Sequence, residues 1–191
     1  NVGVGFNSLR NNTTGQALTA VGRCALANNT TRDKSVAVGA NTLCCNTTGR
    51  FNTALGSYAM RFNTTGENNS VLGSGALCLN TLGSKNVAVG NAALESNTIG
   101  CYNVAVGFAA LRCNTTALRN TAVGHYSLAK VTTAVDNTAV GYRTLQCSTA
   151  SNNTAVGKQA LQGNTTGTRN TGLGTNALST NATTNNNTAV G

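Results

Sequence analysis

The chain has 191 residues, of which 40% are hydrophobic and 9% are charged, and it holds 22 Gly, 7 Cys and no Pro or Trp. Disordered segments combine few apolar residues with high charge, so this composition argues against disorder. The net charge is +9, but the basic residues scatter along the chain without interleaved aromatic residues, which argues against nucleic-acid binding.

A five-residue motif, Asn-Thr-Ala-Val-Gly, recurs along the chain. It stands at residues 120–124, 137–141, 153–157 and 187–191, and close variants fill the positions between. The closing glycines are 17 residues apart, except for Gly141 and Gly157, which are 16 apart. A fixed period of this kind predicts a solenoid of stacked coils. We therefore expect residues 1–191 to form a single array of eleven repeats and a partial one, the internal part of a longer fibre.

The first element of each repeat is a predicted strand. Numbered from its Asn, the unit reads Asn-Thr-Ala-Val-Gly-x-x-Ala-Leu-x-x-Asn-Thr-Thr-Gly-x-x. The first five places are short, alternating and β-branched, which is typical of a β-strand. The Gly at the fifth place marks a corner or the close approach of another backbone. We expect an all-β fold, a parallel β-solenoid or β-roll with one 17-residue coil per repeat.

Two places of the unit never lose a large apolar residue. The fourth is Val or Leu in every copy, and the ninth is Leu except at Met60. A solenoid coil points few side chains inward, so we expect these two places to form the core, with a second short strand around the ninth. The predicted core residues are Val38, Leu43, Val89, Leu94, Val106, Leu111, Val123, Leu128, Val140 and Leu145.

The next element is a turn with the pattern Asn-Thr-Thr-Gly. Asn bonds its own backbone in turns, and Gly supplies positive φ. Identical Asn and Thr residues on successive coils can also hydrogen-bond in ladders. The predicted turn and ladder residues are Asn46, Asn63, Asn114 and Asn164. This pattern degenerates across residues 131–151, where we expect a local irregularity.

The strand also predicts a surface for association. If Val faces inward, alternation places the Ala of the third place on the outer wall, with the Gly of the fifth. Such a wall lets a partner backbone approach, and two medium-sized side chains per coil make a thin core. We therefore expect identical chains to associate, with three around an axis as the preferred arrangement. Ala105 and Ala122 are the candidates for contact between chains.

The cysteines give no framework of disulfides within one chain, because no two consecutive repeats carry Cys at the same place. In an assembly of identical chains, however, residues at a seam meet their own copies. The row of Cys45, Cys113 and Cys147 is therefore a candidate for interchain contact, as is the row of Cys44 and Cys78.

Chemistry at a catalytic or metal site is not expected. The Cys spacing and the single His125 do not form a zinc pattern, and no two of the four acids form a pair for acid–base work. We expect no enzymatic activity, no cofactor and no metal.

Residues 137–142 (Asn-Thr-Ala-Val-Gly-Tyr) and 160–167 (Ala-Leu-Gln-Gly-Asn-Thr-Thr-Gly) resemble the repeats of phage and viral tail-fibre shafts. The Asn-x-Ala-Val-Gly half is also similar to the head repeats of trimeric autotransporter adhesins, which are left-handed parallel β-rolls. This resemblance implies a trimeric, elongated, extracellular shaft or adhesive fibre of a virion or cell surface. Its partners would be its own copies and a host-surface glycan or receptor, with no insertion into a membrane.

A ligand-binding solenoid is the alternative, for example an ice-binding or glycan-binding protein. The rows of Thr from Thr13 to Thr165 and from Thr14 to Thr166 support it. Against it, adjacent Thr residues in a turn do not share one flat face, and a charge of +9 has no role in binding ice.

Overall fold

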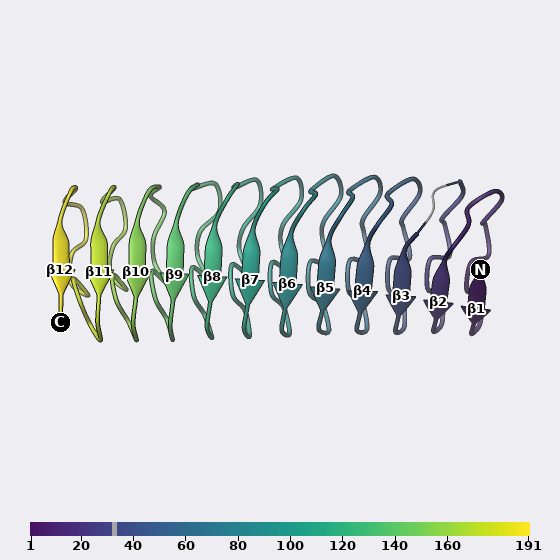
Figure 1. The fold of residues 1–191 in the computed structure, drawn as a ribbon, viewed down its shortest axis with the longest axis horizontal. Helices are drawn as coiled ribbons and strands as arrows, with labels where there is room; N and C mark the ends of the chain where they lie inside the picture. Colours follow the sequence, from purple (N-terminus) through teal and green to yellow (C-terminus); the bar gives the residue numbers. More distant parts are fainter. Residues whose placement is uncertain (32–33) are drawn as a thin grey trace.

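The chain folds into a single solenoid with one parallel sheet along its length. The computed structural model describes residues 1–31 and 34–191. Twelve three-residue strands lie side by side in chain order, and the described residues contain no helix (Figure 1). The strands are β1 (Val2–Val4), β2 (Thr19–Val21), β3 (Val36–Val38), β4 (Thr53–Leu55), β5 (Ser70–Leu72), β6 (Val87–Val89), β7 (Val104–Val106), β8 (Thr121–Val123), β9 (Thr138–Val140), β10 (Thr154–Val156), β11 (Thr171–Leu173) and β12 (Thr188–Val190). This confirms the all-β parallel solenoid with one 17-residue coil per repeat.

The interior of each coil is filled by the Leu of the ninth place. Leu43, Leu94, Leu111, Leu128 and Leu145 are all fully buried. The single substitution at this place, Met60, is buried as well, since its side chain has a similar volume. The leucine half of the predicted core is therefore confirmed.

The prediction of which strand face points inward was wrong. Ala105 and Ala122, expected on the outer wall, are fully buried. The valines expected in the core, by contrast, are only partly buried; these are Val38, Val89, Val106, Val123 and Val140. The reason is space: a methyl group built on Gly172, at the third place, would lie only 3.3 Å from Leu161 Cγ. With Leu filling the coil from the other wall, the third place holds Ala or Gly in eleven of the twelve strands, and Val71 is the one larger residue there.

The second strand expected around the ninth place is instead a run of turns. The backbone is left-handed at the seventh and ninth places, as at Asn41 (φ 56°) and Leu43 (φ 49°). A residue other than Gly in this region costs about 1–2 kcal/mol. Bonds between coils offset that cost, for example from the Leu43 N–H to the Ala59 carbonyl at 3.1 Å. The turn wall is thus bonded from coil to coil although it contains no strand.

Two ladders of buried Asn run parallel to the sheet. In the first-place ladder, Asn103 donates from both its backbone and its side chain to Asn86 Oδ1, at 2.9 and 3.2 Å. In the twelfth-place ladder, Asn63 Nδ2 donates to Asn46 Oδ1 at 2.7 Å. The predicted ladder role is confirmed for Asn46 and Asn63.

The twelfth-place ladder stops where the repeat degenerates. Asn114 donates to Asn97 Oδ1 at 2.6 Å, but its own buried Oδ1 has no partner because Val131 takes the next position. Asn164 bonds only within its turn, to the Gly167 carbonyl at 2.9 Å. Asn114 therefore ends the ladder, and Asn164 stands outside it.

The coil that lacks one residue leaves the sheet intact. Strands β9 and β10 pair in register, with Thr138 opposite Thr154. The shortened turn is closed by Ser148, whose Oγ accepts from the Ala150 N–H at 3.2 Å. The predicted irregularity is confined to the turn, and the rows of side chains on the sheet continue across it.

Candidate interaction surface

The outer side of the sheet is the main surface feature of the solenoid. Since alternate residues of a strand face opposite sides, burial of the third place turns the second and fourth places outward. We call these two outward rows the sheet face. Every one of their side chains is Val, Leu, Thr or Ser, so no charged residue lies on it.

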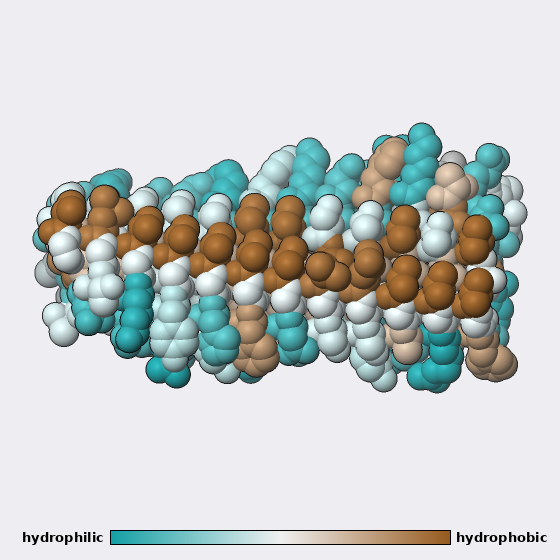
Figure 2. Space-filling model, turned by 60° about the horizontal axis from the view of Figure 1, so that its bottom comes forward, coloured by the Kyte–Doolittle hydropathy of each residue, from teal (hydrophilic) through white to brown (hydrophobic). Residues whose placement is uncertain are grey.

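The fourth-place row forms an apolar band that we call the Val/Leu stripe. Figure 2 shows it as an unbroken brown line along the molecule. Its members are Val4, Val21, Val38, Leu55, Leu72, Val89, Val106, Val123, Val140, Val156, Leu173 and Val190. Leu72 is 52% exposed and Val156 is 40% exposed, although both lie in the middle of a regular sheet. Contiguous apolar surface of this kind marks sites of interaction.

The second-place row is mixed. Val2, Val36, Val87 and Val104 widen the stripe, and the other strands carry Thr or Ser at this place. Parallel in-register pairing, such as Val104 opposite Thr121, keeps each row straight. The sheet face is therefore a narrow, regular, uncharged plane two residues wide.

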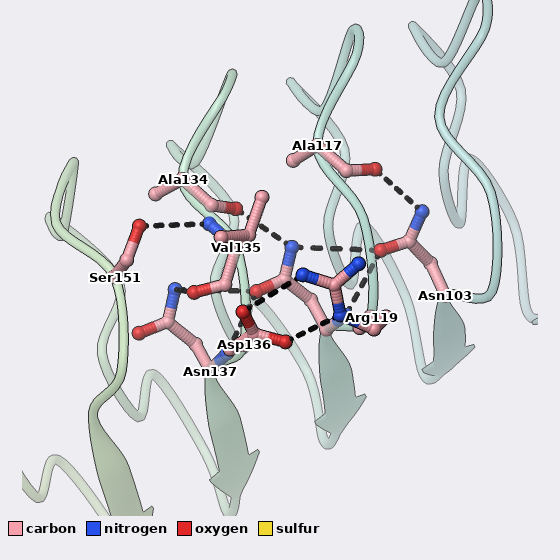
Figure 3. Close-up of polar contacts among 9 residues, drawn as sticks. Asn103, Ala117, Arg119, Ala134, Val135, Asp136, Asn137 and Ser151 are labelled. Carbon is pink, nitrogen blue, oxygen red and sulfur yellow. Dashed lines mark hydrogen bonds and ion pairs between the residues drawn. The ribbon is translucent and has the colours of Figure 1, made fainter.

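An ion pair between coils lies just before the strands β8 and β9. Arg119 Nε and Nη2 donate to the two carboxylate oxygens of Asp136, at 2.7 and 3.0 Å (Figure 3). The hydrogen bond from Arg119 and its positive charge lower the pKa of the Asp136 carboxyl. Because both side chains are exposed to solvent, the pair contributes little to stability.

The cysteines lie on the turns rather than on the sheet face. All seven are free and half-buried, including Cys45, Cys113 and Cys147. Burial raises the pKa of the Cys44 thiol, and the neighbouring Cys45 and Cys24 raise it further. Burial is also the main cause that raises the pKa of Cys78. Pairing of a cysteine with its own copy in a second chain remains a prediction.

The described residues offer neither a metal-binding cluster nor a membrane-spanning helix. In residues 1–31 and 34–191, no group of three or more His, Cys, Asp or Glu side chains could hold a metal ion. Within the same ranges, no helix has the length and apolar character to span a membrane.

The chain matches no protein-family model, no curated protein and no solved structure. Sequence reasoning missed the sheet face, because it assigned the Val/Leu stripe to the core and Ala105 and Ala122 to the surface. The structure reverses both assignments.

Proposed function

We propose that this chain is a non-enzymatic structural element of an extracellular fibre, a shaft or adhesive filament of a virion or cell surface. Identical chains would pack through the sheet face. The observation that carries the proposal is the Val/Leu stripe, an apolar row on all twelve strands whose members are exposed or partly exposed. Burying it removes apolar surface from water, which is the main driving force of association.

The thin interior of each coil supports the same proposal. In most coils one Leu and the Ala methyl groups fill the interior, while the larger Val and Leu side chains of the fourth place stay at least partly outside. At about 25 cal/mol per Å² of apolar surface, the exposed part of the stripe is a source of stabilisation that the isolated chain leaves unused. Association of chains would bury the stripe and so add this stabilisation.

Three chains around an axis parallel to the solenoid would suit the shape of this face. A threefold axis sets each chain against two neighbours, and the sheet face has two rows, one for each. Cyclic symmetry also brings residues that lie close to the axis near their own copies. The larger Leu55 and Leu72 on β4 and β5 would then meet at one level of the fibre.

The experiment compares two leucines of nearly equal exposure. Leu72 lies on the stripe and is 52% exposed, whereas Leu82 lies on a turn and is 54% exposed. Leu72→Lys places a charge in the proposed interface and should reduce the native mass to that of one chain, 19.3 kDa. Leu82→Lys should leave the mass of the assembly unchanged. Equal masses for the two variants, with unchanged far-ultraviolet circular dichroism, would show that the chains do not pack through the sheet face.

A ligand-binding solenoid is the second candidate, and the second-place row favours it. Seven strands turn a Thr outward there: Thr19, Thr53, Thr121, Thr138, Thr154, Thr171 and Thr188. These hydroxyl groups alternate with apolar side chains on a regular plane, which is a surface suited to an ordered lattice such as ice. Of the two turn rows first considered for this role, the row from Thr13 to Thr165 is less suitable, because Thr64 and its equivalents donate their hydroxyls to the next coil, to Thr81 O at 3.1 Å.

The two candidates make opposite predictions for the free chain. A fibre element associates and leaves the freezing point of water unaffected beyond its colligative effect. An ice-binding solenoid is active as a single chain with an open sheet face. Thermal hysteresis measured together with native mass separates them, and hysteresis that is lost in Thr138→Lys would favour the second candidate.

A further inference from the structure

A notch opens on the turn wall, away from the strands that form the sheet face. Ala129 lines it from the tenth place of its coil, and the longer residues Arg112 and Gln146 occupy the tenth place of the coils on either side. The notch has a volume of about 180 Å³. Its lining residues are Arg112, Cys113, Tyr126, Ala129, Lys130 and Gln146. This size fits one small ring rather than a drug-sized ligand.

A cluster of rings supports one wall of the notch. His125 stacks between Phe108 and Tyr142, with ring centroids 4.9 and 5.7 Å apart. Tyr126 lies across this stack, at 85° to Phe108 and at 88° to His125. Contacts between aromatic rings in these geometries are favourable. Tyr126 is therefore held in place where it lines the notch.

The polar groups around the notch are almost all donors. Arg112 is partly neutralised by Glu95 at 3.6 Å, but Lys130 has no ion-pair partner among the described residues. The Gln146 Oε1 already accepts from Gln162 Nε2 at 3.2 Å, which leaves the Gln146 Nε2 free to donate. A ligand must therefore supply acceptors and negative charge, as a carboxylate does.

From these features we propose that the notch binds a carboxylate-bearing sugar residue. In this arrangement the carboxylate lies between the side chains of Lys130 and Arg112. The Gln146 amide donates to a ring hydroxyl, and the apolar face of the sugar packs on Tyr126. The inference goes beyond the proposed fibre by giving it a class of glycan ligand. It does not require assembly, because the notch and the Val/Leu stripe belong to different segments of the coil.

The binding test uses the complete chain and small probes that separate ring from charge. Glucuronic acid carries both, glucose has the ring alone, and acetate has the charge alone. Titrations followed by ligand-observed nuclear magnetic resonance should show saturable binding of glucuronate. Glucose and acetate should each bind at least about tenfold more weakly, as expected for loss of a charge-assisted hydrogen bond or of the ring contact.

Matched variants locate the site. Gln stands naturally at the tenth place of the next coils, so Ala129→Gln should fill the notch without disturbing the solenoid. The control is Ala27→Gln, at the tenth place of a distant coil and equally buried. Lys130→Ala removes the unpaired cation, and Arg23→Ala removes one exposed charge elsewhere. The dissociation constant for glucuronate should rise by about tenfold or more in Ala129→Gln and Lys130→Ala and stay within about twofold in the controls.

Several results would overturn the proposal. These are absence of glucuronate binding, equal affinity for glucose and glucuronate, or unchanged affinity in Ala129→Gln. Tighter binding of N-acetylglutamate than of glucuronate would point to an acidic peptide instead. Native mass measured on the same samples keeps this test apart from the fibre proposal, since glucuronate can bind to a chain that does not associate and an assembled fibre can lack the site.

Discussion

At the scale of single residues, the fifth-place Gly is held by the approach of the next coil. Gly107 has φ of +133°, and a Cβ on it would lie 2.6 Å from the Gly124 carbonyl oxygen. No side chain fits at such a distance. Gly75, at the seventh place, has φ of +65° but meets no atom within 4 Å. Other coils hold Asn41 and Tyr58 at that place with a similar backbone.

Two glycine substitutions should therefore differ sharply. Gly107→Ala forces neighbouring coils apart and should lower the free energy of unfolding by about 3 kcal/mol or more. Gly75→Asn should change it by less than about 1 kcal/mol, because Asn tolerates a left-handed backbone. Thermal and denaturant melts followed by circular dichroism measure both values. A Gly107→Ala variant as stable as the parent would contradict the tight stacking at the corner.

The cysteines give a second prediction at this scale. Since burial raises the pKa of the Cys44 and Cys78 thiols, less of the reactive thiolate forms near neutral pH. Both should react with iodoacetamide more slowly in the native chain than in the urea-unfolded chain, and the difference should shrink as the pH rises through the raised pKa. Peptide mass spectrometry gives the two rates. Equal rates in the folded and unfolded chain would argue against this burial.

At the scale of elements, the Asn ladders hold successive coils together where the apolar core is thin. Asn97 donates to Asn80 Oδ1 at 2.8 Å and to the Gly100 carbonyl at 3.0 Å, and it accepts from Asn114 Nδ2 at 2.6 Å. Each of these partners is buried. The members of the ladder depend on one another, because loss of the Asn97 side chain removes the bonds to Asn80 Oδ1 and from Asn114 Nδ2 in the two neighbouring coils.

Asn97→Ala should consequently destabilise the chain by about 2–4 kcal/mol, since a buried polar group left unpaired costs about 1–3 kcal/mol. Asn91→Ala provides the control, because Asn91 is exposed and makes a single bond to the Ser74 carbonyl at 3.1 Å. That variant should stay within about 0.5 kcal/mol of the parent. Similar losses in both variants, measured by denaturant melts, would show that the ladder is not a special source of stability.

The sequence was enough to predict the coil, the buried Leu of the ninth place and the Asn ladder, because each follows from an exact recurrence. It was not enough to predict which strand face is buried. Ala and Val are both apolar, so their alternation gives the period of the strand but not its phase. Restriction of the third place to Gly, Ala and Val71 was the available signal, since small residues mark the tightest contact. The left-handed Leu of the turn wall had no such signal, because Leu rarely adopts that backbone.

The wrong assignment of the buried strand face also led to a wrong prediction of the surface for contact between chains. With Val106 and Val123 placed in the core, Ala105 and Ala122 were left as the surface for contact between chains. The structure puts these alanines inside, where enlargement of Ala105 should unfold the coil instead of only separating chains. The notch at Ala129 was not predicted, although the repeat places Ala129 between Arg112 and Gln146 of the neighbouring coils. It depends on a small residue having long neighbours one coil away on both sides.

At the scale of the whole molecule, the solenoid combines an uncharged sheet face with charge on its other walls. The net charge of +9 comes from 13 Lys and Arg against four acids, and none of those that the structure describes lies in a strand. This distribution favours solubility of the charged walls and leaves the sheet face as the place for specific contact. A fibre with the stripes at its centre would expose the charged turns and the notch.

Sedimentation equilibrium of the chain over a hundredfold range of concentration tests this account most directly. If the sheet face joins three chains, the measured mass should be three times 19.3 kDa, about 58 kDa, and should fall to that of one chain in Leu72→Lys. A mass of 19.3 kDa at every concentration, with the solenoid intact by circular dichroism, would contradict assembly through the Val/Leu stripe.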